Sequence, residues 1–526
     1  MRTLLTASAI ALAAATAQAQ ELTVAVANMS SYLEPGTDHS NVGSQFYVNS
    51  FETLLGKDPF SGEAVFEPQL ATEWELLGDR RARLTIREGV KFHNGDDMTI
   101  EDVLFSFQAM MNVTHPARVE RSREMFSNIA RIEQVDDTTV EIIAKQPEPL
   151  MELILNQQNG MILPKKYLMG LTGDPNVDET SDYIAFGLAP VGTGPYRVAE
   201  FTPSERLVWE RFDDYWGEPA PYERVTVRFI PELSARVTAL VNDEVDLITN
   251  IPPDQVPVID NSPGYKTEGA VTPLFHVVFF GTGERDPNVT PELRKAMMLA
   301  VDRDLLNEAL WEGKAVVPST HTYPQFGDFY TPDLVTFRHD LEEAMQIVAD
   351  NDLEGTELTF HTHPVYYTNG VLAAQAMKEM WAEIGINVNL NVAIERPNAG
   401  LREVANWSNP MYFADPHGSF GKMWAPTGAG ISRGFWEPSI GLEEYTKLYD
   451  AFRYETDVEA RNAAFARVME EVEKDAPFFI KYQPYESWGM REDLDWAPFP
   501  GHIPYVLDFR AGMVGDAKNG ITRATN

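Results

Sequence analysis

The residues of this chain with the most obvious chemical potential are histidines, carboxylates and aromatic rings, because the 526-residue sequence contains no cysteine. His361 and His363 stand two positions apart. On a strand, that spacing would place both imidazoles on one face, which a transition metal accepts. No acidic residue lies within three positions of the pair and no third histidine lies close to them in the sequence, so the competing interpretation is a surface-facing strand with two histidines. We expect no metal site here, and an exported hydrolase that uses these histidines or carboxylates stays an alternative.

Sequence patterns of the common catalytic sites are missing. The sequence has no G-x-S-x-G elbow, Walker loop, H-E-x-x-H motif or dinucleotide fingerprint after a strand. Gly428, Gly430 and Gly434 resemble a phosphate loop only loosely, because no strand precedes them and Pro438 would break a following helix. Adjacent acids such as Asp96 and Asp97 stand beside turn residues, where aspartate closes turns. The sequence therefore predicts no enzyme and no cofactor.

One segment, residues 406–420, combines aromatic rings with polar groups, as the wall of a ligand cleft does. A Gly- and Pro-rich loop behind it carries two tryptophans, and large aromatic residues in loops often form contact surfaces. A tyrosine near the N-terminus is a weaker candidate for the opposite wall. The competing interpretation is a set of core aromatic residues plus an Asp-Pro turn. The predicted ligand-binding residues are Trp407, Asp415, Tyr412, Phe413, Tyr32, Trp424 and Trp436.

Strands and helices that would position these residues are visible in the hydrophobic pattern. Alternating Leu22, Val24 and Val26 predict a strand, and residues 386–394 predict a second. Thr99, with Asp102 three residues on, predicts a capped helix start. Further helices are expected over three stretches, and strands that alternate with helices indicate an α/β fold with mixed sheets. These three stretches are 371–384, 457–474, and the stripe Leu293, Met297, Ala300, Val301 and Leu305 after the cap Thr290.

Composition limits the class of protein. The length favours two or three domains with room for a cleft between them. Lys and Arg total 42 against 79 Asp and Glu, so the net charge of -37 would repel nucleic acid and anionic lipid. A nucleic-acid partner is therefore not expected.

The first residues have the pattern of a secretory signal. Arg2 precedes an apolar run from Leu4 to Ala17, and Ala17-Gln18-Ala19 is a cleavage pattern. We expect a signal peptide over residues 1–19 and export of the rest. Without a cysteine at the cleavage site the protein cannot be a lipoprotein, so a periplasmic location is expected.

Ordered motifs along nearly all of the remaining chain resemble the family 5 solute-binding proteins of ABC importers, the dipeptide- and oligopeptide-binding group. An early Leu33-Glu-Pro35 is similar to the usual Leu-Asp-Pro of that family. The motifs that carry the resemblance are Leu70-Ala-Thr-Glu-Trp74, Arg87 to Gly95, Thr99 to Val103, Val191-Gly-Thr-Gly-Pro-Tyr196, Tyr215-Trp216, Ala239 to Asp246, Leu293 to Ala296 and Ala300 to Arg303.

The resemblance implies a periplasmic-binding-protein-like α/β fold of two lobes. Two crossing hinge segments would join the lobes, near Phe275–Gly281 and Lys481–Trp488, and lobe I would carry an inserted small domain. The implied division is 20–47 plus 187–274 plus 488–526 for lobe I, 48–186 for the small domain, and 275–487 for lobe II with the hinges.

The resemblance also implies a function: a monomeric receptor that closes around a small solute, most simply a di- or oligopeptide, and delivers it to ABC permease subunits in the inner membrane. Peptide binders of this family often pair an aspartate with the α-ammonium of the ligand, and Asp415 is the best match. Ser408 and Asn409 replace the acids usual nearer the tryptophan. An oligosaccharide or opine-like solute therefore stays an alternative, and a periplasmic chaperone would instead need an exposed apolar patch.

Overall fold

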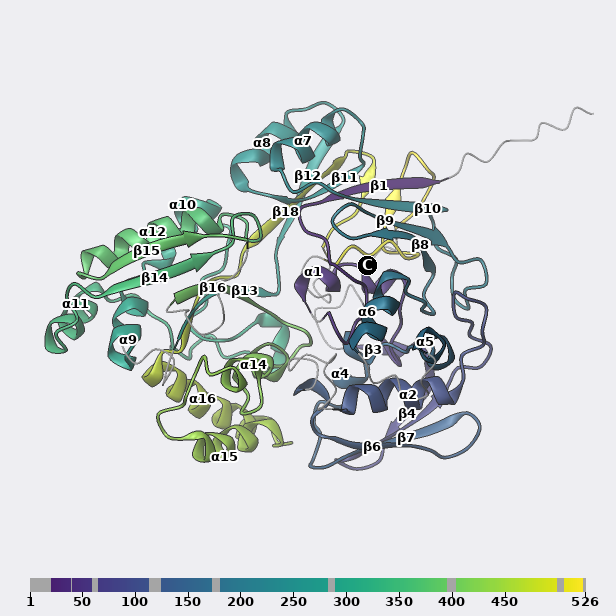
Figure 1. Ribbon diagram of the computed structural model, residues 1–526, viewed down its shortest axis with the longest axis horizontal. Helices are drawn as coiled ribbons and strands as arrows, with labels where there is room; N and C mark the ends of the chain where they lie inside the picture. Colours follow the sequence, from purple (N-terminus) through teal and green to yellow (C-terminus); the bar gives the residue numbers. More distant parts are fainter. Residues whose placement is uncertain are drawn as a thin grey trace, which may run out of the picture.

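The computed structural model describes residues 20–38, 40–58, 65–112, 124–172, 180–281, 289–394, 404–498 and 506–523. Three larger sheets and the helices around them build this part of the chain (Figure 1). The predicted α/β class with mixed sheets is confirmed. The signal peptide expected over residues 1–19 lies outside the described residues.

A seven-stranded mixed sheet contains the first strand, β1 (Glu21–Val26). Leu22, Val24 and Val26 are buried, as their alternation predicts. Strand β1 pairs in parallel with β10 and β11, and the remaining pairs of the sheet are antiparallel. The other members, in chain order, are β8 (Tyr196–Thr202), β9 (Arg206–Arg211), β10 (Arg224–Phe229), β11 (Leu247–Ile251), β12 (Tyr265–Val271) and β18 (Tyr485–Arg491), with helices α7 (Leu233–Val241) and α8 (Val256–Asp260) packed on them.

A four-stranded antiparallel sheet, in the order β4-β5-β7-β6, comes between β1 and β8 in the sequence. Helix α2 begins as predicted, because the Thr99 backbone N–H donates to the Asp102 carboxylate at 2.8 Å. The elements of this region are β2 (Leu55–Lys57), β3 (Phe66–Pro68), β4 (Ala71–Leu76), β5 (Arg81–Ile86), α2 (Ile100–Met111), β6 (Ile129–Gln134), β7 (Thr139–Ala144), α4 (Met151–Leu155), α5 (Lys165–Thr172) and α6 (Thr180–Leu188).

A five-stranded sheet in the order β15-β14-β16-β13-β17 organises most of the chain after residue 273. Helices flank it on the left of Figure 1. Its strands are β13 (Leu274–Phe280), β14 (Glu357–Thr362), β15 (Asn387–Val392), β16 (Val404–Pro410) and β17 (Phe478–Tyr482); its main helices are α9 (Pro291–Leu299), α10 (Arg303–Trp311), α11 (Leu341–Asp350), α12 (Gly370–Glu383), α15 (Leu442–Arg453) and α16 (Val458–Asp475). We call this body lobe II, and the body with the other two large sheets lobe I.

Two short connections join the lobes. Strand β12 of lobe I continues through Thr272 and Pro273 into β13 of lobe II, and β17 returns through Gln483 and Pro484 into β18. The two connections lie side by side, because the Thr272 N–H donates to the Pro484 carbonyl at 3.1 Å. The first crossing precedes the expected segment 275–281, because that segment pairs along β13 with β16 and β17.

Lobe I has one large apolar core that runs through both of its larger sheets. Val24 of β1, Leu84 of β5 and Val140 of β7 belong to the same buried cluster. The predicted limits of the inserted small domain therefore stay a prediction, since the core does not divide there. Within the described residues, we find no helix with both the length and the apolar character needed to cross a bilayer.

Candidate functional site

The lobes meet where the chain leaves β16. Tyr412 and Phe413 follow this strand of lobe II, yet they pack into the core of lobe I, with 7% and 5% of their surfaces exposed. Asn41, in the short helix α1 (Asn41–Ser44) of lobe I, donates its amide Nδ2 to Ser408 Oγ at 2.9 Å. We call this contact region the seam. Two rings of one lobe buried in the other make the structure a closed arrangement of the lobes.

Buried polar contacts hold the lobes together at a second place. The Arg453 guanidinium at the end of α15 donates to both carboxylate oxygens of Glu148, at 2.8 and 2.6 Å. Asn128 also donates to Glu148, at 2.9 Å, and Thr427 of lobe II contacts Glu124 of lobe I. The ion pair is buried and therefore costs desolvation, which the additional hydrogen bond partly offsets.

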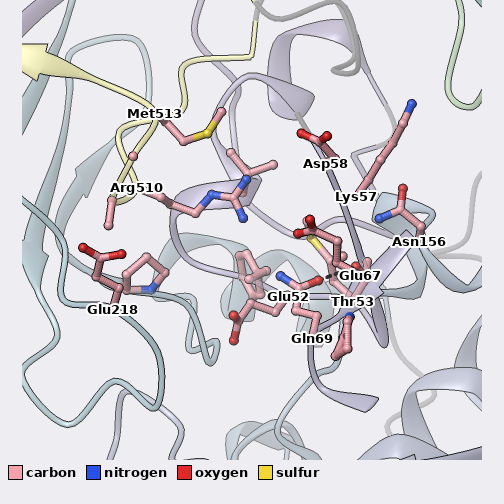
Figure 2. Close-up of a pocket in the computed structure, with 18 of the residues that line it drawn as sticks. Glu52, Thr53, Lys57, Asp58, Glu67, Gln69, Asn156, Glu218, Arg510 and Met513 are labelled. Atoms are coloured by element: carbon pink, nitrogen blue, oxygen red, sulfur yellow. Dashed lines mark hydrogen bonds between the residues drawn. The ribbon is translucent and has the colours of Figure 1, made fainter. Parts of the chain in front are cut away.

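A cavity of about 460 Å³ lies in lobe I beside the seam (Figure 2). Tyr412 is its one lining residue from lobe II, so closure of the lobes completes the wall. Its volume is within the range of small-molecule sites, about 300–1,000 Å³. Lobe I supplies the rest of the lining: Val48, Phe51, Glu52, Thr53, Gly56, Lys57, Asp58, Glu67, Pro68, Gln69, Asn156, Gln158, Met161, Pro195, Tyr215, Trp216, Glu218, Arg510, Ala511, Gly512 and Met513.

Two charged groups of the cavity wall, Glu52 and Arg510, are held by hydrogen bonds to neighbouring side chains. Glu52 accepts hydrogen bonds from Tyr215 OH at 2.8 Å and Trp216 Nε1 at 2.9 Å. Burial raises the pKa of Glu52, against the opposing effect of these hydrogen bonds. Arg510 donates from Nε and Nη2 to Asp508; burial alone would lower its pKa, but Asp508 raises it. These hydrogen bonds fix the side chains of Glu52 and Arg510 in the cavity wall.

The structure brings two of the seven predicted site residues to the lobe boundary. Tyr412 and Phe413 lie at the seam, and Tyr412 OH accepts a hydrogen bond from Lys422 Nζ at 3.1 Å. Trp407 on β16 is partly buried, with its ring 5.6 Å from that of Phe279. Contact of these residues with a solute stays a prediction.

Tyr32 lies in lobe I and is partly buried. The neighbouring Leu33 N–H donates to the Gly187 carbonyl at 2.7 Å, and a Cβ at Gly187 would lie 2.9 Å from Tyr32 Cβ. Burial, together with the charges of Asp38 and Glu34, raises the pKa of Tyr32. Tyr32 is therefore a neutral side chain, and a role in solute binding stays a prediction for it too.

Trp424 and Trp436 lie in the core of lobe II, with 1% and 0% of their surfaces exposed. The Trp424 ring stacks on Phe478 at 4.8 Å, and Trp436 Nε1 donates to Asp475 Oδ2 at 3.0 Å. This packing does not support the predicted contact surface, because neither ring faces a cleft in this arrangement. The Gly- and Pro-rich loop folds inward to complete the core.

Asp415 is fully buried, and Arg461 of α16 occupies both of its carboxylate oxygens. The carboxylate also accepts the His417 backbone N–H at 2.8 Å. An α-ammonium could reach Asp415 only by displacing a guanidinium from a buried ion pair. The geometry therefore does not support the prediction that Asp415 binds the ligand. It agrees instead with the competing interpretation, in which Asp415 is part of an Asp-Pro turn.

His361 and His363 lie in different environments, one in the core and the other in a turn. His361 is buried, contrary to the surface-facing interpretation, whereas His363 Nδ1 accepts the Tyr366 N–H at 2.9 Å and closes a turn. Among the described residues, no group of three His, Asp or Glu side chains could hold a metal ion. The glycine loop is close-packed: a Cβ at Gly430 would lie 2.6 Å from the Met423 carbonyl oxygen.

Several residues of the cavity wall were not predicted from the sequence. Trp216 belongs to the Tyr215-Trp216 motif, which contributed only to the family resemblance, and Arg510 has no local signal at all. Aromatic rings beside acidic groups, as at Tyr215-Trp216 with Glu218, were the one available sequence signal. The wall is assembled from segments near residues 52, 67, 216 and 510, which only the fold brings together.

Comparison with known proteins gives consistent matches. The family model of bacterial extracellular solute-binding proteins, family 5 Middle, matches residues 65–430. Over 345 residues the chain is 24% identical to the dipeptide-binding protein of Escherichia coli. That alignment covers 61% of this chain and 62% of the relative, so it spans less than two thirds of the relative's length.

Two solved structures share the fold over nearly the whole chain. The ABC transporter-associated periplasmic binding protein DppA from Helicobacter pylori, in complex with peptide STSA, has a TM-score of 0.81 at 24% identity and covers 95% of this chain and 98% of its own. The PBP AgaA from A.tumefacien, in complex with agropinic acid, has a TM-score of 0.78 at 21% identity, with coverage of 92% and 96%. At these identities the two structures establish the fold.

Proposed function

The chain belongs to the bacterial extracellular solute-binding proteins of family 5, and we propose that it captures a small solute between its lobes and delivers it to the permease of an ABC importer. The observation that carries the proposal is the position of Tyr412. This residue of lobe II lines a cavity that is otherwise built by lobe I, so the cavity wall is complete only when the lobes are closed. A solute in the cavity would make contacts that exist only in the closed state, which is the requirement for ligand-driven closure.

A peptide is the solute class that we propose. The dipeptide-binding relative and the peptide complex of similar fold support this class. The alternative is an opine-like or oligosaccharide solute, and the agropinic acid complex of similar fold favours the opine among these. The burial of Asp415 in an ion pair removes the expected ammonium partner, so a peptide would need a different anchor.

A role in transport also implies where the protein is located and which proteins it contacts. We propose that residues 1–19 are a signal peptide, that the exported chain is a periplasmic monomer, and that ABC permease subunits in the inner membrane are its partners. The solute would be released unaltered, so we propose no chemical step. The alternative of an exported hydrolase at His361 and His363 has little support, because His363 closes a turn.

The experiment is a thermal-shift screen of the purified chain against peptides, opines and oligosaccharides, with native mass spectrometry of the chain as isolated. We expect one solute class to raise the melting temperature and to be recovered chemically intact. Small-angle scattering should show a smaller radius of gyration when this solute is present. Absence of binding by every class, or conversion of the solute, would contradict the proposed function.

A further inference from the structure

A second cavity, of about 340 Å³, lies beside the two connections that join the lobes. Val271, the last residue of β12 in lobe I, and Gln483, in the returning connection, both line it. We call it the hinge cavity, and it shares no lining residue with the cavity beside the seam. Lobe II supplies the rest of the lining: Val316, Val317, Pro318, Ser319, Thr322, Pro324, Gln325, Tyr330 and Pro332.

The shape of the hinge cavity depends on the position of the lobes. The Gln483 N–H donates to the Val316 carbonyl at 2.7 Å, and the Val316 N–H donates to the Gln483 carbonyl at 3.0 Å. These two hydrogen bonds hold the returning connection against lobe II, whereas Val271 belongs to lobe I. A rotation of the lobes about the connections would therefore move Val271 relative to Val316 and change the cavity.

Two glutamine side chains of the lining have hydrogen-bonding groups without a partner. Gln483 is 3% exposed, and its side-chain amide makes no hydrogen bond to any described residue. The Gln325 Oε1 is buried, and it too has no partner within the described part of the chain. Since a carboxamide both donates and accepts, an amide or hydroxyl group of a ligand would satisfy either side chain.

The wall of the hinge cavity is uncharged. Among the described residues, no Asp, Glu, Lys, Arg or His lines it, although the chain contains 79 acidic and 42 basic residues. A charged ligand would lose its hydration here without meeting an opposite charge, which is costly. Valine and proline side chains and the Tyr330 ring instead suit an apolar body. The volume lies within the range of small-molecule sites, about 300–1,000 Å³.

We propose that the hinge cavity is a second ligand site, which takes a small uncharged molecule with an apolar body and an amide or hydroxyl group, and that its occupancy favours the closed lobes. Residues of both lobes form its wall in the closed arrangement. A ligand that fits this wall binds the closed form more tightly and shifts the lobes toward it. Binding at this site is independent of the proposed function, whereas the effect on closure concerns the same lobe motion.

The test is a titration of the full chain, without solute, with benzamide, benzoate and benzamidine, followed by ligand-observed NMR. These probes share one shape and differ in charge. Salt at about 0.15 M screens the general attraction of an acidic chain for the cation. Benzamide should bind at least about tenfold more tightly than either charged probe, a difference of about 1.4 kcal/mol. Small-angle scattering should give a smaller radius of gyration with benzamide than with benzoate.

Variants then place benzamide at the hinge. Gln483→Met and Gln325→Met keep the length of the side chain and remove its amide, so each should weaken benzamide several-fold. Gln346→Met is the matched control and should have no effect, because Gln346 donates to Asp350 on the exposed face of α11. Val316→Trp, at a wall residue that is 43% exposed, should fill the cavity and abolish benzamide binding.

Equal affinities for the three probes overturn the proposed site, and so does an affinity for benzamide that Val316→Trp leaves unchanged. A radius of gyration that stays the same with bound benzamide overturns the effect on closure. The proposed function fails by a different measurement, when no solute class binds in the thermal-shift screen or when the solute is converted. Loss of the hinge site therefore leaves the receptor function standing.

Discussion

Glu148 and Arg453 form a two-pronged ion pair across the lobes, with 0% and 3% of their side-chain surfaces exposed, although 305 residues separate them in the sequence. Because both charges are out of water, separation of the lobes would return them to solvent and recover their hydration. The pair therefore sets part of the balance between open and closed forms, and its net sign depends on the desolvation cost.

Glu148→Gln is expected to favour the open form. The substitution leaves Arg453 as a buried charge without its carboxylate, and removal of one member of a buried pair typically costs about 3–5 kcal/mol. Opening of the lobes relieves this cost by exposing Arg453 to water. Small-angle scattering without solute should give a larger radius of gyration than for the parent chain. Glu443→Gln, at an exposed acid that pairs with Lys447 on the same helix, is the control and should leave the radius unchanged.

Asp415→Asn is expected to destabilise lobe II without changing solute affinity. It leaves Arg461 buried with an uncompensated charge, so the loss in unfolding free energy should be on the order of 3–5 kcal/mol. Urea denaturation measures this loss, and calorimetry on the folded fraction measures affinity. Asp213→Asn, at an exposed ion pair with Arg211, should cost less than about 1 kcal/mol. A selective loss of affinity in Asp415→Asn would restore Asp415 as a ligand group.

Tyr412→Ala is expected to weaken solute binding at least about tenfold, because it removes the cavity wall that lobe II supplies. Tyr412→Phe keeps the ring and loses only the hydroxyl that accepts from Lys422, so it should bind within a few-fold of the parent chain. Titration calorimetry compares the two variants. Equal losses of solute affinity in both variants would mean that the Tyr412 hydroxyl, and not its ring as part of the cavity wall, determines the affinity.

Local structure was predictable from the sequence where a few neighbouring residues decide it. The Thr99 cap, the strand at residues 387–392 and the helix at 458–475 agree with the expected positions. The stripe from Leu293 to Leu305 predicted one helix, but α9 ends at Leu299 and α10 begins at Arg303. Asp302 caps the second helix by accepting the Leu305 N–H at 2.9 Å, and an aspartate inside a periodic stripe could have indicated this break.

The candidate site was predictable only in part, because its groups meet through the fold. Tyr412 was found from its aromatic surroundings, and it does lie at the boundary of the lobes. Asp415 and Arg461 are 46 residues apart, so no local pattern could show that the carboxylate is already paired. Trp424 has the composition of a binding loop but packs on Phe478 of β17, a partner that the sequence does not indicate.

Lys481 gives a prediction for pH, because it is buried in lobe II with its Nζ 2.8 Å from Asn406 Oδ1. Burial lowers the pKa of Lys481 from 10.5 to about 7. Between pH 7 and 10.5 the unfolded chain holds a proton that the folded chain has released. The unfolding free energy should therefore rise with pH in this window, by at most about 1.4 kcal/mol per pH unit for one proton.

Lys481→Met removes this titration. The unfolding free energy of the variant should exceed that of the parent chain most at pH values well below 7, where both states of the parent hold the proton and the buried charge carries its full desolvation cost. The difference in unfolding free energy between the variant and the parent chain should decrease toward pH 10. Loss of the hydrogen bond to Asn406 lowers the unfolding free energy of the variant by a similar amount at every pH. His276, whose pKa burial and Lys481 hold well below 6.5, stays neutral throughout. Urea denaturation at several pH values measures the difference, and the exposed Lys447→Met is the control. A difference between Lys481→Met and the parent chain that does not vary with pH would mean that Lys481 keeps its proton in the folded protein.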